Sequence, residues 1–128
     1  MASPTVLLIE DNPDTRRVLG KMLERLGCAV EFESDGRAAI ARARKSPPNL
    51  ILLDMRLPGL DGQELLPKIR ATRGLETVPI VGISGYSFPE MRREAVELGC
   101  VRFLEKPVSL EAQRDTLAEV LGHPSPGK

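Results

Sequence analysis

The chain has 128 residues, enough for one domain with a substantial buried core. Lysine plus arginine and aspartate plus glutamate each number 18, so the formal net charge is zero, and no nucleic acid or anionic membrane is expected as a main partner. No apolar stretch is long enough to span a membrane, and the N-terminus lacks the basic and apolar segments of a secretion signal. These features are typical of a cytoplasmic protein.

The two cysteines and the one histidine do not form a metal-binding pattern. Cys28 and Cys100 each lie beside an expected strand, and in a reducing compartment they are expected to remain reduced as small buried side chains. His123 is far from both cysteines in the sequence, which argues against a zinc site.

The first half of the chain predicts three strands separated by two helices. Each expected strand is a short apolar run, and the first and third runs are continuous, as in strands covered on both faces. The first helix is expected to begin at Asn12 and Pro13, which suit an N-cap and a first helical position, and to end before Gly27. The second is expected to start at Asp35 and to end before the prolines 47–48. The expected strands are residues 5–9, 29–32 and 50–53.

The second half continues the alternation with three helices and two strands. Pro67 would interrupt a helix unless that helix begins near Gln63, so that the proline falls in the first turn. Pro89 is expected to open the next helix and Ser109 to cap the last one. The expected elements are helices near residues 63–74, 89–99 and 109–121 and strands at 78–83 and 101–104.

Strands that alternate with helices form parallel sheets through right-handed crossover connections. The sequence therefore predicts one α/β domain over residues 5–121, with a short tail at residues 1–4 and a flexible tail at 122–128 that is rich in glycine and proline. Because parallel strands run in one direction, their carboxyl ends meet at the edge where open α/β sheets bind ligands.

Reactive polar side chains follow four of the five expected strands. Three carboxylates in one pocket repel one another, by roughly 4 kcal/mol for two charges about 4 Å apart at an effective dielectric near 20, so the cluster suggests a bound cation. Oxygen ligands favour Mg²⁺ or a similar ion such as Mn²⁺, and a lysine and a serine can contact phosphoryl oxygens. The set predicts a phosphoryl-transfer site with Asp54 as the nucleophile. Its members are Glu10, Asp11, Asp54, Ser84 and Lys106.

Each of these residues also has an ordinary structural interpretation. Taken singly, the acidic pair could be a solvated turn, Asp54 a helix cap and Lys106 a surface lysine. A hydrolase nucleophile elbow requires G-x-S-x-G, but Tyr86 stands where the last glycine should be. No phosphate-binding glycine loop follows any expected strand, which argues against a nucleotide-binding protein.

Four segments in a fixed order and spacing carry a resemblance to a known family: residues 6–12, 54–62, 84–85 and 106–107. Through them the chain resembles the receiver domains of two-component response regulators, including the chemotaxis regulators, over residues 5–121. The resemblance implies a flavodoxin-like fold, in which a doubly wound, five-stranded parallel sheet has the strand order 2-1-3-4-5 and five helices cover it.

The resemblance also implies roles in phosphoryl transfer. Asp54 would accept a phosphoryl group from a histidine kinase or a phosphotransfer protein. Lys106 and Ser84 would contact that group, and a cis bond would precede Pro107. Ser84 and Phe103 would act as switch residues, although plain packing beside the helix at 89–99 is an equally good interpretation of Phe103.

For the metal, the resemblance implies Mg²⁺ or Mn²⁺ bound directly by Asp11, Asp54 and the backbone carbonyl of Arg56. Glu10 would act through a metal-bound water.

The function implied is a phosphorylation-controlled signalling switch with self-catalysed phosphotransfer and dephosphorylation, not an enzyme with turnover. No output domain follows residue 121, so output is expected through protein–protein contacts of the face formed by the last two helices and the strand between them. The chain could be a stand-alone regulator, a phosphorelay intermediate, or a receiver detached from a hybrid kinase or larger regulator. A small aspartyl-phosphate phosphotransferase is less favoured, because such enzymes have an acid where Arg56 stands. A constitutive interaction module would not need the intact site.

Overall fold

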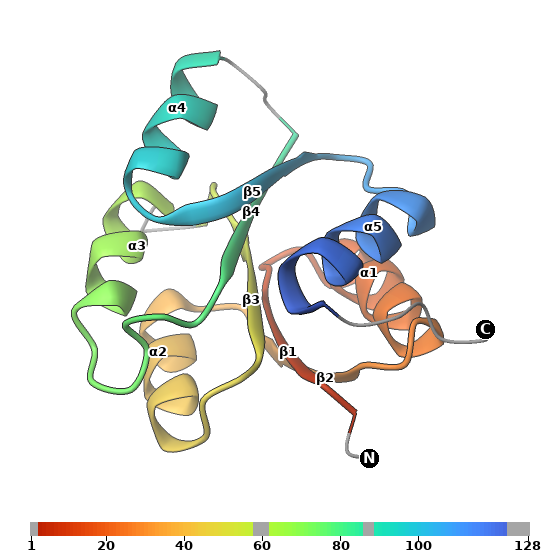
Figure 1. Ribbon diagram of the computed structural model, residues 1–128, viewed down its shortest axis with the longest axis horizontal. Helices are drawn as coiled ribbons and strands as arrows, with labels where there is room; N and C mark the ends of the chain where they lie inside the picture. Colours follow the sequence, from red (N-terminus) through yellow and green to blue (C-terminus); the bar gives the residue numbers. More distant parts are fainter. Residues whose placement is uncertain (1–2, 58–61, 86–88, 123–128) are drawn as a thin grey trace.

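A computed structural model describes residues 3–57, 62–85 and 89–122 (Figure 1). Within these ranges five strands alternate with five helices, and the strands form one parallel sheet in the order β2-β1-β3-β4-β5. This arrangement confirms the predicted doubly wound fold. The elements are β1 Thr5–Ile9, α1 Pro13–Arg25, β2 Ala29–Glu33, α2 Gly36–Lys45, β3 Leu50–Asp54, α3 Gly62–Arg70, β4 Ile80–Ser84, α4 Pro89–Glu97, β5 Cys100–Glu105 and α5 Leu110–Leu121.

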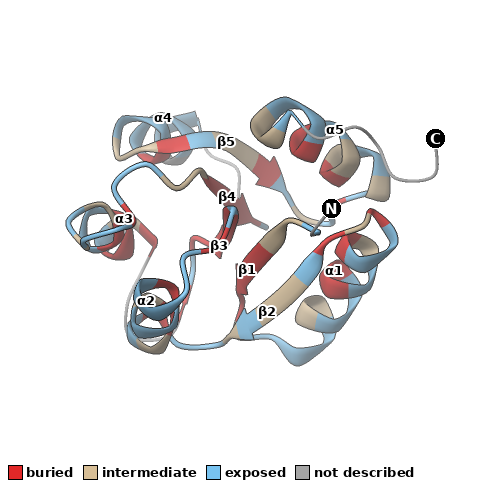
Figure 2. Cartoon of the chain, turned by 60° about the horizontal axis from the view of Figure 1, so that its bottom comes forward, coloured by how far each residue is buried: buried red, intermediate tan, exposed pale blue. Residues whose placement is uncertain are grey.

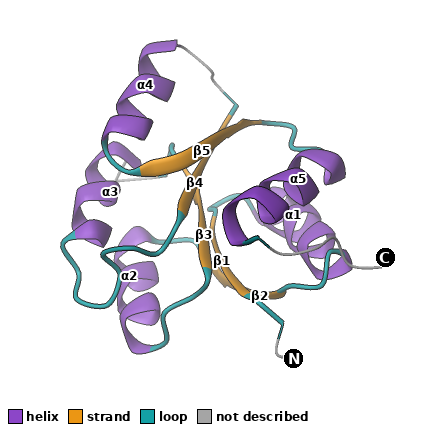
Figure 3. Cartoon of the chain, viewed as in Figure 1, coloured by secondary structure: helices purple, strands orange, loops and turns teal. Residues whose placement is uncertain are grey.

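The sheet lies between two layers of helices, with α1 and α5 on one face and α2, α3 and α4 on the other (Figure 3). Successive side chains of a strand point to opposite faces, so each strand contributes to both cores. In β1, Leu7 and Ile9 pack toward α2 and α3, whereas Val6 and Leu8 pack toward α1 and α5. Every residue of β3 and β4 is buried, as expected for central strands covered on both sides (Figure 2).

The helix ends follow the predicted capping residues. The Asn12 side chain accepts hydrogen bonds from the first turn of α1, and Gly27 follows its C-terminal end with a φ of 90°. Asp35 caps α2 and Ser109 caps α5 in the same way.

Helix α3 corrects the expected placement of Pro67. The helix begins at Gly62, so Pro67 is its sixth residue and lies inside the helix, beyond the first turn. The proline ring faces solvent, and the inward Leu65, Leu66 and Ile69 are at most 1% exposed. The burial of these side chains compensates for the hydrogen bond that the proline cannot donate.

Several boundaries in the second half differ from the sequence expectation, among them the end of α3 and the start of β4. Helix α3 ends at Arg70, before the turn that leads to Gly74. Strand β4 begins at Ile80, because Pro79 has no N–H group and the Val78 carbonyl accepts a hydrogen bond from the Arg70 side chain at 2.6 Å. The expected tail beyond Gly122, and part of the loop that follows β3, lie outside the described residues. No helix in the described ranges combines the length and apolar character needed to cross a bilayer.

Candidate functional site

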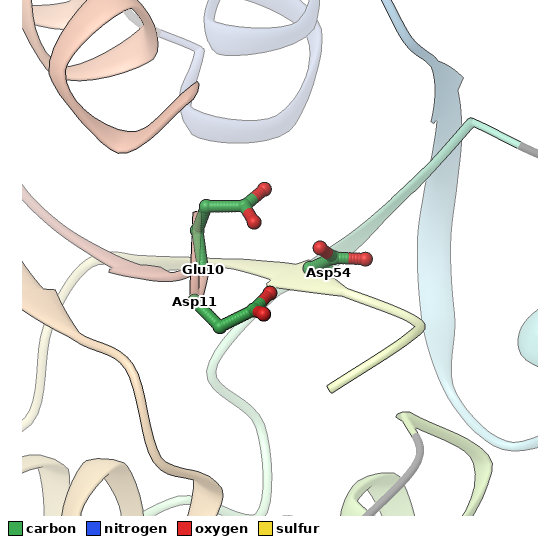
Figure 4. A group of neighbouring side chains, drawn as sticks. All are labelled: Glu10, Asp11 and Asp54. Atoms are coloured by element: carbon green, nitrogen blue, oxygen red, sulfur yellow. The ribbon is translucent and has the colours of Figure 1, made fainter. Parts of the chain in front are cut away.

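Three carboxylates meet at the carboxyl edge of the sheet. Glu10 and Asp11 directly follow β1, and Asp54 is the last residue of the neighbouring strand β3. One carboxylate oxygen of each residue lies within 4.8 Å of the corresponding oxygens of the other two, and the three groups face a common space (Figure 4). Glu10 is 1% exposed and Asp54 4% exposed, while Asp11 is more open to solvent. The parallel sheet therefore brings together the acidic residues that the sequence singled out.

Lys106 contacts both buried carboxylates. Its Nζ lies 3.0 Å from Asp54 Oδ2 and 2.8 Å from Glu10 Oε1. The contact with Asp54 is a hydrogen bond, whereas the contact with Glu10 lacks hydrogen-bond geometry and leaves Oε1 as a buried oxygen without a hydrogen-bond donor. The Lys106 backbone N–H donates to the Ser84 carbonyl at 2.8 Å, and the bond before Pro107 is cis, as the resemblance implies.

Backbone amides hold the other oxygen of each buried carboxylate. The Arg56 N–H donates to Asp54 Oδ1 at 2.9 Å. The Asn12 N–H donates to Glu10 Oε2 at 3.1 Å, a role that the sequence did not suggest, because Asn12 was recognised only as a helix cap. These bonds fix the orientation of Glu10 and Asp54 before any ligand binds.

The electrostatic balance of the site favours an added cation. Burial raises the pKa of Glu10, and the Asp54 carboxylate raises it further, although Lys106 and the Asn12 amide act in the opposite direction. Burial by itself lowers the pKa of Lys106, but its contacts with Glu10 and Asp54 outweigh burial and raise that pKa. One ammonium group thus contacts two of the three clustered carboxylates, and this oxygen-only donor set fits a hard divalent ion.

The two expected switch residues, Ser84 and Phe103, lie on the neighbouring strands β4 and β5. Ser84 is fully buried at the end of β4, one residue beyond Ile83, the register partner of Asp54. The half-buried Phe103 ring lies against Gly82, where an added Cβ would come within 3.2 Å of the ring. The Arg92 guanidinium carbon lies 5.6 Å from the ring centroid, a cation–π contact that no sequence motif signals.

The family model for the response regulator receiver domain matches residues 6–118. The sensor histidine kinase RcsC of Salmonella typhi is 34% identical over 113 residues, which are 88% of this chain but only 12% of that kinase. An uncharacterized 14.6 kDa protein of Leptolyngbya boryana is 32% identical over 108 residues, covering 84% of this chain and 82% of its own length.

Solved structures that superpose on this chain include receiver domains of the same family. Chemotaxis protein CheY4 of Vibrio cholerae superposes with a TM-score of 0.87 at 29% identity, covering 93% of this chain and 99% of its own. The receiver domain of a Pseudomonas aeruginosa sensor histidine kinase also superposes with a TM-score of 0.87, at 32% identity. The superposition covers 95% of this chain and 100% of that receiver domain. A magnesium ion is coordinated in its active site cleft.

The fold and the acidic edge define a phosphorylation-controlled signalling module. The chain belongs to the response regulator receiver domain family of two-component signalling. Members of this family are signalling switches, not enzymes with turnover, and they interact with histidine kinases or phosphotransfer proteins and with downstream effectors.

Proposed function

We propose that Asp54 is the phosphoryl acceptor of this receiver and that a histidine kinase or phosphotransfer protein is the donor. The observation that supports the proposal is the position of the Asp54 carboxylate, which lies at the carboxyl end of a central strand beside the Lys106 ammonium and two further carboxylates. That end of the sheet is where open α/β folds bind ligands.

The transfer breaks the phosphorus–nitrogen bond of the donor phosphohistidine and forms a bond between phosphorus and an Asp54 oxygen. The bonding pair of the old bond stays on the imidazole nitrogen, which takes up a proton. The Lys106 ammonium offsets negative charge on the phosphoryl oxygens, and the Ser84 hydroxyl donates a hydrogen bond to one of them. Attack by water on the acyl phosphate returns Asp54 to a carboxylate and releases inorganic phosphate, which gives the switch an intrinsic off step.

We assign the metal ligands to Asp11, Asp54 and the Arg56 carbonyl, with Glu10 acting through a metal-bound water. Support comes from the oxygen-only donor set, from the buried Glu10 Oε1 and from the magnesium ion in the related receiver domain. Bound Mg²⁺ or Mn²⁺ would neutralise carboxylate charge and polarise phosphoryl oxygens. This chain's own residues orient Asp54 through the Arg56 amide and keep Lys106 beside it.

Two surfaces suit the two kinds of partner. An apolar groove of about 430 Å³ lies between α1 and residues 106–108, which follow β5, and it reaches Lys106. This position suits a phosphodonor protein that must approach the site. Val96 on α4 and Val101 on β5 are more than half exposed, and they support output through the face formed by α4, β5 and α5.

The acceptor residue is tested by chemical trapping. After incubation with a small phosphodonor and Mg²⁺, borohydride reduction of an acyl phosphate converts the modified aspartate to homoserine. Peptide mapping should find homoserine at position 54. Homoserine at position 11, or none at all in protein that has taken up phosphate, would reject Asp54 as the acceptor.

A further inference from the structure

Arg16 reaches back from the first turns of α1 to the residue that follows β1. Its Nη1 donates a hydrogen bond of 3.2 Å to the backbone carbonyl of Glu10, and the contact is partly buried. We propose that Arg16 is a positioning residue for the cation site, because its guanidinium holds the peptide group that carries Asp11. The inference rests on the metal site of the proposed function and adds to it a residue that is not itself a ligand.

Asp11 differs from the other two carboxylates in what holds it. Glu10 and Asp54 each have one oxygen near Lys106 and the other on a backbone amide. Among the described residues, no hydrogen bond or ion pair holds the Asp11 carboxylate, which is also the most exposed of the three. The direction of this side chain therefore depends on the backbone that carries it.

That backbone is anchored on two sides. On the sheet side, the Glu10 N–H donates to the Glu33 carbonyl at 3.0 Å. On the helix side, Arg16 binds the Glu10 carbonyl, and the Arg16 N–H is itself bonded to the Asn12 carbonyl at 2.9 Å. The Glu10 carbonyl and the Asp11 N–H belong to the same planar peptide group. Losing the guanidinium would free this plane to rotate, and the Cα–Cβ bond of Asp11 would rotate with it.

The positive charge of Arg16 and its positioning role have opposite expected effects on the affinity for a cation. A guanidinium near the site repels a divalent cation, so by charge alone the loss of Arg16 would tighten cation binding. A residue that orients a ligand strengthens binding, and its loss weakens it. The sign of the change in affinity therefore distinguishes the two roles, and we expect positioning to dominate.

The test compares Arg16→Met with Arg17→Met in the unphosphorylated full chain. Arg17 is the neighbouring residue in α1, but its exposed side chain pairs with Asp14 at 3.3 Å and does not contact Glu10. Both variants lose one positive charge and keep an apolar stem, and only Arg16→Met loses the bond to the Glu10 carbonyl. The dissociation constant for Mn²⁺ is measured from the electron paramagnetic resonance signal of the free ion.

We expect Arg16→Met to bind Mn²⁺ about tenfold more weakly than the wild type, and Arg17→Met to bind it nearly as the wild type does. Arg16→Lys keeps a donor and should recover part of the loss. Thermal melts without cation should be alike for both methionine variants. Should Arg16→Met fail to fold, Arg16→Gln, which is too short to make the same contact, replaces it.

Unchanged or tighter Mn²⁺ binding in folded Arg16→Met or Arg16→Gln would overturn the inference. Equal weakening in Arg17→Met would also overturn it, because the effect would then come from net charge. A wild-type protein that binds no Mn²⁺ would instead reject the proposed metal site itself, so the two failures are distinct.

Discussion

At the scale of single residues, the clustered carboxylates repel one another, and Lys106 and the amides of Asn12 and Arg56 partly offset this repulsion in the cation-free protein. Burial and the neighbouring Asp54 carboxylate both raise the pKa of Glu10, which shows that ionising these groups together is unfavourable. The proposed cation and phosphoryl site therefore lowers the stability of the protein when no cation is bound.

We expect Asp54→Asn to raise the stability of the cation-free protein by roughly 1 kcal/mol, because one of the repelling charges is removed while most of the shape is kept. The measurement is urea unfolding in the presence of chelator. Adding Mg²⁺ should stabilise the wild type more than the variant, since the variant has lost a ligand. Asp115→Asn, on the exposed surface of α5, serves as the control and should change little. A less stable Asp54→Asn protein without cation would contradict this account.

Cys100 gives a prediction about alkaline pH. Burial raises the pKa of its thiol to about 11 from the usual 9.0, although Arg70 and the Gly82 backbone lower it somewhat. Because the folded state keeps the proton longer than the unfolded state, the contribution to stability is complete below pH 9 and is lost as pH rises toward 11.

Between pH 8 and roughly pH 11 the wild type should therefore lose up to about 2 kcal/mol more stability than Cys100→Ala. Urea unfolding of both proteins at several pH values measures the difference, in which the other alkaline titrations cancel. If the free energies of unfolding of the two proteins fall equally with pH, the thiol has the same pKa in the folded and unfolded states, and the prediction is wrong.

Sequence reasoning found the acidic residues, Ser84 and Lys106 because they follow strands whose direction the fold dictates. It did not find Arg16 or the amide of Asn12 as contacts of Glu10. The helical period places Arg16, and not Arg17, on the face of α1 that carries the buried Leu19 and Leu23. The group that Arg16 meets on the sheet depends on the direction of α1 relative to β1, which the sequence does not give.

At the scale of elements, the connection from β3 to α3 depends on close approach of two backbone segments. The Gly62 N–H donates to the Met55 carbonyl at 3.0 Å. A Cβ at Gly62 would lie 2.8 Å from Met55 Cα and 2.7 Å from its sulfur. The backbone atom cannot move aside without shifting the strand end that carries Asp54.

We expect Gly62→Ala to destabilise the protein by about 2–3 kcal/mol, because the clash involves backbone and not only a flexible side chain. Gly85→Ala is the matched control, since no described atom lies within 4 Å of a Cβ at that position. Thermal unfolding of both variants measures the difference in their stability. Equal stabilities would mean that the β3–α3 connection tolerates a side chain.

The alternation of apolar runs and capping residues predicted which segments are strands and which are helices. It did not predict every residue at which these elements begin and end. The sequence placed Pro67 in a first turn, but the buried face of α3 holds the proline inside the helix. The start of β4 depends on the hydrogen bond from the Arg70 side chain to the Val78 carbonyl. The two residues are eight positions apart, and the local sequence pattern does not reveal this contact.

At the scale of the whole molecule, two exposed valines mark different surfaces. Val18 on α1 is 48% exposed and lines the groove that reaches Lys106, while Val96 on α4 is 57% exposed. Helices α1 and α4 lie on opposite faces of the sheet (Figure 1). A phosphodonor protein and an output partner can therefore use separate surfaces of the domain.

We expect Val18→Asp to slow phosphotransfer from a protein donor at least about tenfold, because a charge is placed in an apolar contact. Its rate with a small phosphodonor should be unchanged, since no docking is needed. Val96→Asp, the matched control on α4, should leave both rates unchanged. Similar slowing with both kinds of donor would show that the substitution disturbs the site and not the docking surface.

The central claim is that Asp54 accepts a phosphoryl group in a cation-dependent reaction. Intact mass spectrometry after incubation with a small phosphodonor tests it most directly. The account predicts a single phosphoryl adduct with Mg²⁺, and no adduct either in Asp54→Asn or in the presence of chelator. An adduct of equal yield in Asp54→Asn, or in wild type without divalent cation, would contradict it.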